Sequence, residues 1–201
     1  MAARELELFF DIGSAYSYLA STQLAGLAER TGASVRWRPF LLGAVFKATG
    51  NDMPARIPAK ARWMLHDLAL WSHHYGVPFR MPSRFPLNTL RTQRALAAAE
   101  LRGAEQVAPL AHALFRAYWV DDQDVSADAV IAACADGAGL DGAAIVAAID
   151  APGTKDQLRA TTDEAVRRGA FGAPAMFVGD ALFWGNDRIP LLEAHLRARA
   201  G

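Results

Sequence analysis

The segment from Phe9 to Ala20 predicts a strand, a tight turn and the start of a helix. Before the turn, Leu6-Glu7-Leu8-Phe9-Phe10 is short, apolar and aromatic, as a buried strand is. Gly13 supplies the turn because glycine adopts positive φ without strain. Ser14 then stands where a helix N-cap belongs, and serine is among the best caps. We therefore expect a hydroxyl at the carboxyl end of a strand and the positive end of a helix, where α/β proteins bind anions.

The predicted elements fall into two groups at the ends of the chain. The first group is a strand, a helix and a strand at residues 6–11, 15–30 and 35–40. This spacing implies a parallel strand pair with a right-handed crossover. The second group is a helix, two strands joined by a Gly179-Asp180 turn, and a last helix, at residues 155–168, 175–178, 181–184 and 189–199. Together they predict an α/β fold of the thioredoxin-like type, βαβ plus ββα.

A long segment without a convincing strand separates the two groups. Helices are expected at residues 59–75, 87–101, 106–119 and 140–149, with a further helix opening near Ser126. At roughly 110 residues this segment is far longer than a plain loop, so we interpret it as an all-helical insertion. The predicted units are residues 1–41 and 153–201 for the thioredoxin-like domain and residues 42–152 for the helical insertion domain.

The Ser14-Ala15-Tyr16-Ser17 segment occupies the position of a thioredoxin Cys-X-X-Cys motif. Both sulfurs are replaced by oxygen, so no thiolate is available for thiol–disulfide exchange. A serine hydroxyl can instead donate a hydrogen bond to the thiolate of another molecule. The alternative is that Ser14 is only a helix cap and Ser17 only a first-turn residue.

The second candidate site is Gly172-Ala173-Pro174, directly before a predicted strand. A trans proline is allowed at the first residue of a strand. In a thioredoxin fold, however, this proline is expected to be cis and to face the start of the first helix. The backbone N–H and C=O of Ala173 would then point outward and pair with an extended peptide ligand.

The third candidate site is Gly185-Asn186-Asp187-Arg188, ahead of the last helix. Asn186 or Asp187 can act as a helix cap. The same helix start can offer N–H donors to a carboxylate while Asp187 pairs with an ammonium group. A ligand that carries both groups on one carbon fits such a site.

The composition excludes several classes of function. Lys plus Arg and Asp plus Glu are both 21, so no basic field is available for nucleic acid or anionic lipid. No run approaches the ~20 apolar residues of a membrane span. The single cysteine, Cys134, rules out an internal disulfide and fits a reducing cytoplasm. The five histidines form no metal-binding pattern, and we expect no metal.

A zwitterionic end, a peptide middle and a sulfur near Ser14 together describe glutathione. Here the sequence resembles the glutathione-dependent 2-hydroxychromene-2-carboxylate isomerases, which are relatives of kappa-class glutathione transferases and Dsb-type oxidoreductases. The resemblance covers nearly the whole chain. Its motifs are Phe-Asp-Ile-Gly-Ser-Ala-Tyr-Ser-Tyr at residues 10–18, Phe85-Pro86-Leu87-Asn88-Thr89, Gly169-Ala170-Phe171-Gly172-Ala173-Pro174 and Gly185-Asn186-Asp187-Arg188.

The resemblance implies a role for each matching position. Ser14 would stabilise the glutathione thiolate and Asn88 would lie on the substrate side. Glutathione itself would be held by Asn51, Lys60, Ala173, Pro174, Asn186 and Asp187. One departure is Ala15, where most relatives carry proline, which loosens the helix start and leaves the hydroxyl in place.

The implied reaction interconverts 2-hydroxychromene-2-carboxylate, a small aromatic substrate, with trans-o-hydroxybenzylidenepyruvate. The resemblance also implies a homodimer, and the cysteine content favours a cytoplasmic location. Two alternatives remain open, since the same glutathione site serves all three. One is a kappa-like transferase or peroxidase that consumes glutathione, and the other is a catalytically silent glutathione-binding protein.

Overall fold

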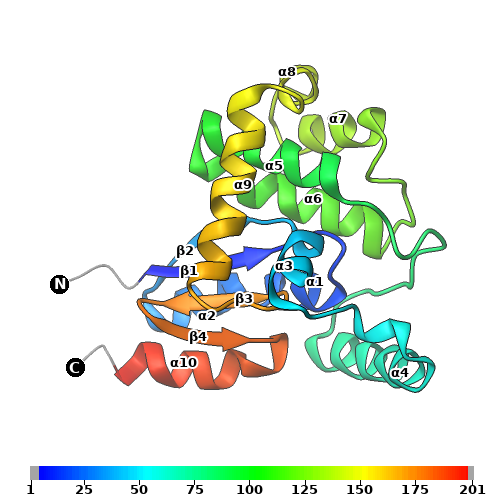
Figure 1. Ribbon diagram of the computed structural model, residues 1–201. Coiled ribbons are helices and arrows are strands. Elements are labelled where there is room, and N and C mark those ends of the chain that lie inside the picture. The colour runs from blue at the N-terminus through cyan, green and yellow to red at the C-terminus, as the bar shows by residue number, and fades with distance from the viewer. Residues whose placement is uncertain (1–4, 199–201) are drawn as a thin grey trace.

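A four-stranded sheet forms the centre of the computed structural model, which describes residues 5–198 (Figure 1). The strands are β1 (Glu5–Phe10), β2 (Ser34–Pro39), β3 (Ala175–Val178) and β4 (Ala181–Trp184), in the order β2-β1-β3-β4. β1 runs parallel to β2 and antiparallel to β3, and β3 and β4 form an antiparallel hairpin. This is the predicted βαβ plus ββα arrangement, so the thioredoxin-like fold class is confirmed.

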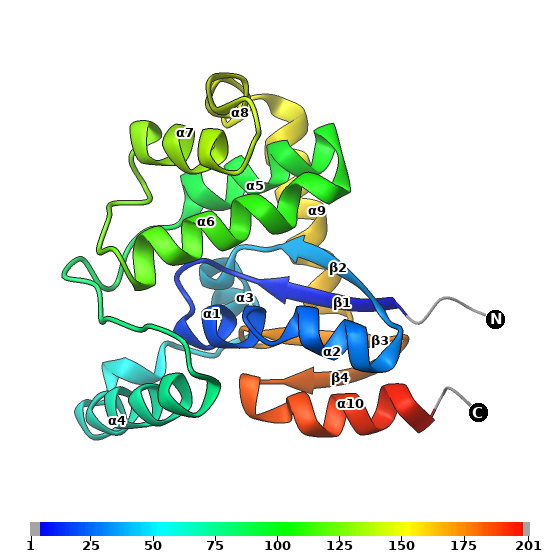
Figure 2. The same cartoon turned by 180° about the vertical axis from the view of Figure 1, so that it is seen from behind.

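Helices cover both faces of the sheet and extend beyond one edge. Figure 1 shows α9 crossing one face beside α3, and Figure 2 shows α1, α2 and α10 on the opposite side, with α5 to α8 beyond β2. Helix α4 lies near α1, apart from the group formed by α5 to α8. The helices are α1 (Ala15–Ser21), α2 (Leu24–Thr31), α3 (Leu42–Thr49), α4 (Pro58–Tyr75), α5 (Leu90–Arg102), α6 (Val107–Trp119), α7 (Asp128–Gly137), α8 (Gly142–Ala148), α9 (Pro152–Arg167) and α10 (Ile189–Ala198), with 3₁₀ turns η1 (Pro54–Arg56), η2 (Ala104–Gln106) and η3 (Asn186–Arg188).

The single helix predicted over residues 15–30 is wrong, because the chain forms two helices with a break at Thr22 and Gln23. The Ser21 hydroxyl donates to the Tyr18 carbonyl, and the Thr22 hydroxyl donates to the Leu19 carbonyl. Such side-chain bonds compete with the helical ladder and bend or end helices. The pattern of apolar spacing alone does not reveal this competition.

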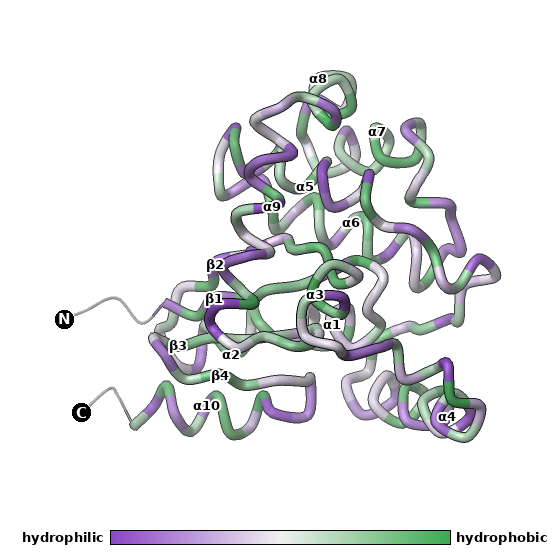
Figure 3. The backbone as a smooth tube through the Cα atoms, in the orientation of Figure 1, coloured by the Kyte–Doolittle hydropathy of each residue, from purple (hydrophilic) through white to green (hydrophobic). Residues whose placement is uncertain are grey.

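Alternation along β1 divides the apolar core into two parts. Leu6, Leu8 and Phe10 belong to a large cluster that includes residues of α1, α2, α5, α6 and α10. Phe9 points to the other face and packs in a smaller cluster with Phe177 and residues of α3 and α9. This alternation follows from the two-residue period of a strand. Figure 3 shows the hairpin of β3 and β4 as largely hydrophobic, whereas β2 carries hydrophilic residues between its apolar ones.

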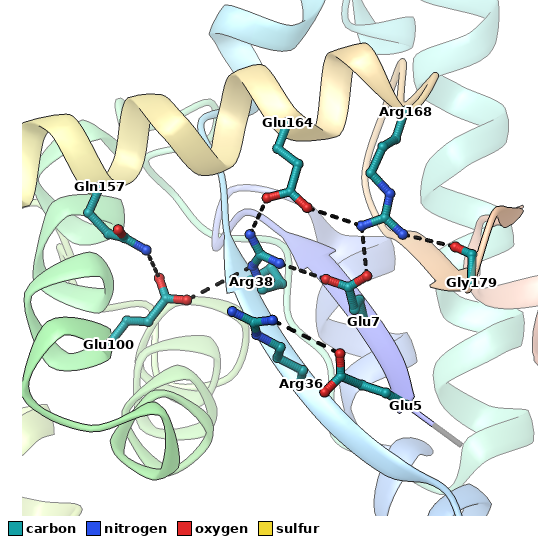
Figure 4. A network of polar contacts seen from close by, with 9 residues as sticks. All are labelled: Glu5, Glu7, Arg36, Arg38, Glu100, Gln157, Glu164, Arg168 and Gly179. Carbon is teal, nitrogen blue, oxygen red and sulfur yellow. Dashed lines mark hydrogen bonds and ion pairs between the residues drawn. The ribbon is translucent and has the colours of Figure 1, made fainter. Parts of the chain in front are cut away.

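A half-buried network of charges fastens α9 to the sheet on the Phe9 face (Figure 4). Arg38 on β2 contacts Glu7 on β1 at 2.6 Å and Glu164 on α9 at 2.5 Å. Arg168, which follows α9, contacts the same two carboxylates at 2.7 and 3.2 Å. Glu100 on α5 lies 3.9 Å from Arg38, so the network also reaches the helical segment.

Residues 42–152 are described in full and contain no strand, as predicted. The division into a thioredoxin-like domain and a helical insertion domain remains a prediction, since it requires that each part folds as a unit of its own. Within residues 5–198, no helix combines the length and the apolar character that crossing a membrane requires.

Candidate functional site

Ser14 lies at the turn between β1 and α1 and caps the helix, as predicted. Its backbone is extended, with φ −97° and ψ 111°, and its hydroxyl oxygen accepts a hydrogen bond from the Ser17 N–H at 3.1 Å. The Ser14 hydroxyl also donates to the carbonyl oxygen of Ala173 at 3.2 Å. These contacts join the start of α1 to the segment before β3, which is 159 residues away in sequence.

The Ala173–Pro174 peptide bond is cis, as the sequence predicts. The Ala173 carbonyl accepts the hydrogen bond from the Ser14 hydroxyl, and the expectation that the polar groups of Ala173 pair with an extended peptide stays a prediction. Within residues 5–198, no acceptor for the Ala173 N–H is found. A second cis bond, Phe85–Pro86, was not anticipated. The sequence analysis used Phe85-Pro86 only as part of a family motif and drew no conclusion on the geometry of its peptide bond.

Asp11 is a buried carboxyl directly beneath the Ser14 turn, and sequence analysis missed it. Its two oxygens accept hydrogen bonds from the N–H groups of Gly13 and Leu42, both at 2.9 Å. Burial raises the pKa of Asp11, although bonds from Leu42, Gly13 and Thr89 act in the opposite direction. Asp11 therefore joins the end of β1 to the first residue of α3 and, through Thr89, to the start of α5.

Asn186 and Asp187 form the start of η3, and the two side chains have different environments. Asn186 is buried, and its amide donates to the Tyr75 hydroxyl at 3.4 Å. Asp187 is 44% exposed and pairs with Arg188 at 2.8 Å. The 3₁₀ turn has no side-chain cap hydrogen bond, so neither Asn186 nor Asp187 caps it. A bond from the Gly185 N–H to the Pro174 carbonyl, 3.1 Å long, connects η3 to the cis-proline segment.

The other three predicted residues, Asn51, Asn88 and Lys60, differ in their contacts with this centre. Asn51 is exposed and donates to the Phe171 carbonyl at 2.8 Å, so it touches the segment before Pro174. Asn88 is exposed and accepts from the Leu90 N–H at 3.0 Å, one residue before Thr89. Lys60 is exposed in the first turn of α4, and none of the ion pairs found in residues 5–198 includes it. Asn51 thus contacts the centre directly, and Lys60 and Asn88 do not.

Two tyrosine hydroxyls hold α4 against the site, and neither was predicted. The Tyr16 hydroxyl donates to Asp67 at 2.8 Å, and the Tyr75 hydroxyl donates to the Asn186 carbonyl at 3.1 Å. Burial raises the pKa of both tyrosines, and for Tyr16 the Asp67 carboxylate raises it further. Leu68 is the one buried residue of α4, and Trp71 and Tyr75 pack partly buried against the core, so the two hydrogen bonds add polar contacts to a small apolar attachment.

The Ser14 hydroxyl, the Ala173 N–H and the exposed Asp187 carboxylate thus follow the end of β1, precede the start of β3 and follow the end of β4, which all lie at the same end of the sheet. Cys134 lies on α7, away from these elements, and burial raises the pKa of its thiol. The Ser17 hydroxyl is buried and has no partner among the described residues. Among residues 5–198, no group of three His, Cys, Asp or Glu side chains could hold a metal. The hydroxyl suits stabilising an anion delivered by a ligand, and it cannot carry out disulfide exchange itself.

Known proteins with the same architecture support the resemblance seen in the sequence. The chain matches the DSBA-like thioredoxin domain over residues 5–197. It is 33% identical over 195 residues to 2-hydroxychromene-2-carboxylate isomerase of Sphingobium xenophagum, spanning 96% of this chain and 98% of the relative. It is 32% identical over 205 residues to glutathione S-transferase kappa 1 of Homo sapiens, spanning 96% of this chain and 90% of the relative.

Comparison with solved structures agrees with these sequence similarities. A solved 2-hydroxychromene-2-carboxylate isomerase superposes with a TM-score of 0.89 at 27% identity, covering 98% of this chain and 96% of that chain. The predicted relationship is confirmed, and the chain belongs to the family of DSBA-like thioredoxin domains, together with the 2-hydroxychromene-2-carboxylate isomerases and kappa-class glutathione transferases.

Proposed function

We propose that this protein is a glutathione-dependent isomerase that interconverts 2-hydroxychromene-2-carboxylate and trans-o-hydroxybenzylidenepyruvate. The observation that carries the proposal is the Ser14 hydroxyl, 3.2 Å from the Ala173 carbonyl, at the position where a thioredoxin has its nucleophilic cysteine. A protein with this fold and no cysteine at that position can use a thiolate that a ligand brings. The similarity to an isomerase that bears this name supports the choice of reaction.

In this proposal Ser14 acts on the sulfur of bound glutathione. A hydroxyl that donates to a thiolate favours the charged form and lowers the thiol pKa. More thiolate is then present near neutral pH, and the thiolate is the nucleophile. In this proposal Ser14 forms no covalent bond to the substrate, and the nucleophile is the thiolate of bound glutathione, not a side chain of the protein.

When bound, glutathione would supply a thiolate that can add reversibly to the conjugated double bond, so that this bond could rotate and re-form with glutathione returned unchanged. Of this chain's residues, Ser14 would stabilise the thiolate by donating its hydroxyl proton in a hydrogen bond. Addition of the phenol oxygen to the ketone, with its proton passing to the ketone oxygen, would give the cyclic hemiketal.

The remaining predicted residues would hold glutathione as an extended peptide. The unpaired N–H of Ala173, beside Pro174, would pair with the cysteinyl backbone. Asp187 would take the γ-glutamyl ammonium group, exchanging its present partner Arg188. Asn51, Lys60 and Asn186 would surround the tripeptide, and Asn88 would lie on the substrate side.

The test is to follow the chromene absorbance with purified protein and a catalytic amount of glutathione. The expected result is relaxation to one equilibrium from either substrate, with total glutathione unchanged at the end. No reaction without glutathione is also expected. S-methylglutathione is the matched control, because it keeps the peptide contacts and lacks a free thiol. Full activity with S-methylglutathione would contradict the thiolate mechanism.

A kappa-like transferase or peroxidase is the second candidate, favoured by the 32% identity to human glutathione S-transferase kappa 1. Stoichiometric loss of glutathione with an electrophilic or peroxide substrate, without chromene turnover, would support it. A catalytically silent protein would bind glutathione and do neither.

We also propose a cytoplasmic homodimer. Trp63 and Leu70 are exposed and lie seven residues apart on one face of α4, so they offer an apolar surface for a second copy. Zero net charge imposes no repulsion between copies. Sedimentation at micromolar concentration should give the mass of two chains, and a monomer at all concentrations would contradict the dimer.

A further inference from the structure

The helical segment holds the Ser14 turn through a buried amide on α5. Gln93 has no exposed surface. Its side-chain oxygen accepts from the Ile12 N–H at 3.3 Å, and its amide nitrogen donates to the carbonyls of Phe10 and Phe40 at 2.9 and 2.8 Å. Both amide N–H groups and the oxygen are therefore engaged. Gln93 ties the carboxyl ends of the two parallel strands to the first residue of the turn that leads to Ser14.

Trp119 on α6 holds Ile12 through its carbonyl group. Its ring N–H donates to the Ile12 carbonyl at 2.8 Å. Trp119 is fully buried, and the rings of Phe79, Phe85 and Tyr118 pack around it. The Ile12 N–H and C=O thus both end on side chains from the helical segment, so neither group is free to reorient.

The rest of the turn is held by Asp11. Its side chain accepts from the Gly13 N–H at 2.9 Å, and its carbonyl accepts from the Ser14 N–H at 3.0 Å. Asp11 carries a titratable carboxyl, so its replacement would change both the geometry and the local charge. Gln93 and Trp119 are neutral, and changes to them report on geometry alone.

We propose that Gln93 and Trp119 are positioning residues that set where the Ser14 hydroxyl meets the sulfur of bound glutathione. The inference rests on the proposed function for the identity of the ligand. A hydrogen bond to a thiolate weakens steeply when its distance and angle change. A displacement of the turn by a fraction of an ångström is therefore expected to reduce the thiolate fraction while leaving the other glutathione contacts in place.

The test uses two variants and one matched control. Gln93→Leu removes three hydrogen bonds at nearly constant size, and Trp119→Phe removes one while keeping a buried ring. Gln157→Leu is the control, because it makes the same change at a half-buried glutamine whose amide donates to Glu100 at 2.9 Å, away from the turn. The ultraviolet absorbance of the thiolate in the glutathione complex is titrated against pH, and glutathione affinity is measured by calorimetry.

Both variants should show about a tenfold lower thiolate fraction at neutral pH, with Kd for glutathione within about threefold of wild type. The control should show no change in either quantity. Amide hydrogen exchange at residues 11–17 without ligand should be faster in the two variants and unchanged in the control. Trp119→Phe decides the question if Gln93→Leu does not fold.

Two failures are distinguishable. If wild type binds glutathione and the folded variants show the same thiolate titration as wild type, the positioning role is overturned and the proposed function is not affected. A wild type that binds no glutathione would overturn the proposed function and this role in glutathione chemistry together. Exchange at residues 11–17 would then show separately whether Gln93 and Trp119 hold the turn.

Discussion

The hydroxyl of Ser14 donates to the carbonyl of Ala173 at 3.2 Å, which is long for a bond between a hydroxyl and a carbonyl oxygen. A hydroxyl has only one proton, so Ser14 cannot donate to Ala173 and to a thiolate at once. The long bond indicates that this proton can be redirected at small cost when an anion arrives. Ser14 keeps its capping role during that change, because capping uses the oxygen as an acceptor from Ser17.

Replacing Ser14 should slow catalysis strongly. In Ser14→Ala the thiolate loses its donor, and the rate at neutral pH should fall by ~10²–10³. The apparent pKa of bound glutathione should rise, and glutathione affinity should change little. Steady-state rates, the thiolate titration and calorimetry check the three expectations.

Ser14→Gly separates catalysis from capping. Loss of the cap in Ser14→Ala should cost about 1 kcal/mol of stability, whereas glycine at an N-cap costs only a few tenths. The two variants should therefore differ in Tm and share the same loss of rate. Full activity in either folded variant would leave Ser14 as a helix cap without a catalytic role.

Ser17→Ala should be tolerated. The Ser17 hydroxyl is buried without a partner in the described part of the chain, so its removal leaves no unsatisfied group behind. The free energy of unfolding should stay constant or increase by up to about 1 kcal/mol, and activity should stay within a few-fold of wild type. A large loss of activity in this variant would show that Ser17 contacts the ligand after a rearrangement.

The features that could be predicted from the sequence depend on neighbouring residues. The Ser14 cap, the Gly179-Asp180 turn and the order of strands each follow from a local pattern of apolar, glycine and hydroxyl residues. That the Pro174 segment faces the start of α1 was also predictable, since the fold class brings those two segments together, but the hydrogen bond from Ser14 to the Ala173 carbonyl was not predicted.

The contacts behind the turn could not be predicted, because they join distant segments. Gln93 lies 81 residues from Ile12, and Trp119 lies 107 residues from it. Neither side chain belongs to a motif, and each reads as an ordinary residue of an amphipathic helix. Where helices of the long segment dock on the sheet depends on packing that the spacing of apolar residues does not specify.

Asp187→Asn should weaken glutathione binding modestly. The carboxylate is 44% exposed and already has Arg188 as a partner, so binding exchanges one charge contact for another. We expect a loss of about 1 kcal/mol, close to fivefold in Kd, that shrinks as salt is added. Turnover at saturating glutathione should change little. Asp180→Asn, an exposed position in the turn between β3 and β4, is the control for the loss of one negative charge. Equal affinities of the Asp187 variant and wild type would place the ammonium group elsewhere.

Arg38→Leu should destabilise the protein severely. The Arg38 side chain is 7% exposed and lies between Glu7 at 2.6 Å and Glu164 at 2.5 Å. Removal of the cation leaves these carboxylates, and Glu100 nearby, with too few positive partners. Breaking a buried pair in this way costs about 3–5 kcal/mol at neutral pH. Arg36→Leu is the matched control on the same strand, because its exposed contact to Glu5 is 4.0 Å long and is expected to contribute almost nothing.

The cost of Arg38→Leu should diminish as the pH falls. Burial alone would raise the pKa of Glu164, but the bonds from Arg38 and Arg168 outweigh burial and hold it below its ordinary value. A carboxyl whose pKa is lower in the folded state stabilises the protein above its unfolded pKa, and that contribution is lost as pH falls through the folded pKa. Wild type should therefore lose stability on acidification below about pH 4.5. In the variant Glu164 should instead take up a proton more readily, which relieves the repulsion within this cluster. Urea unfolding at pH 7 and pH 4 should show the difference between the two proteins narrowing, and a difference that widens toward acid would mean that Arg38 does not neutralise this cluster.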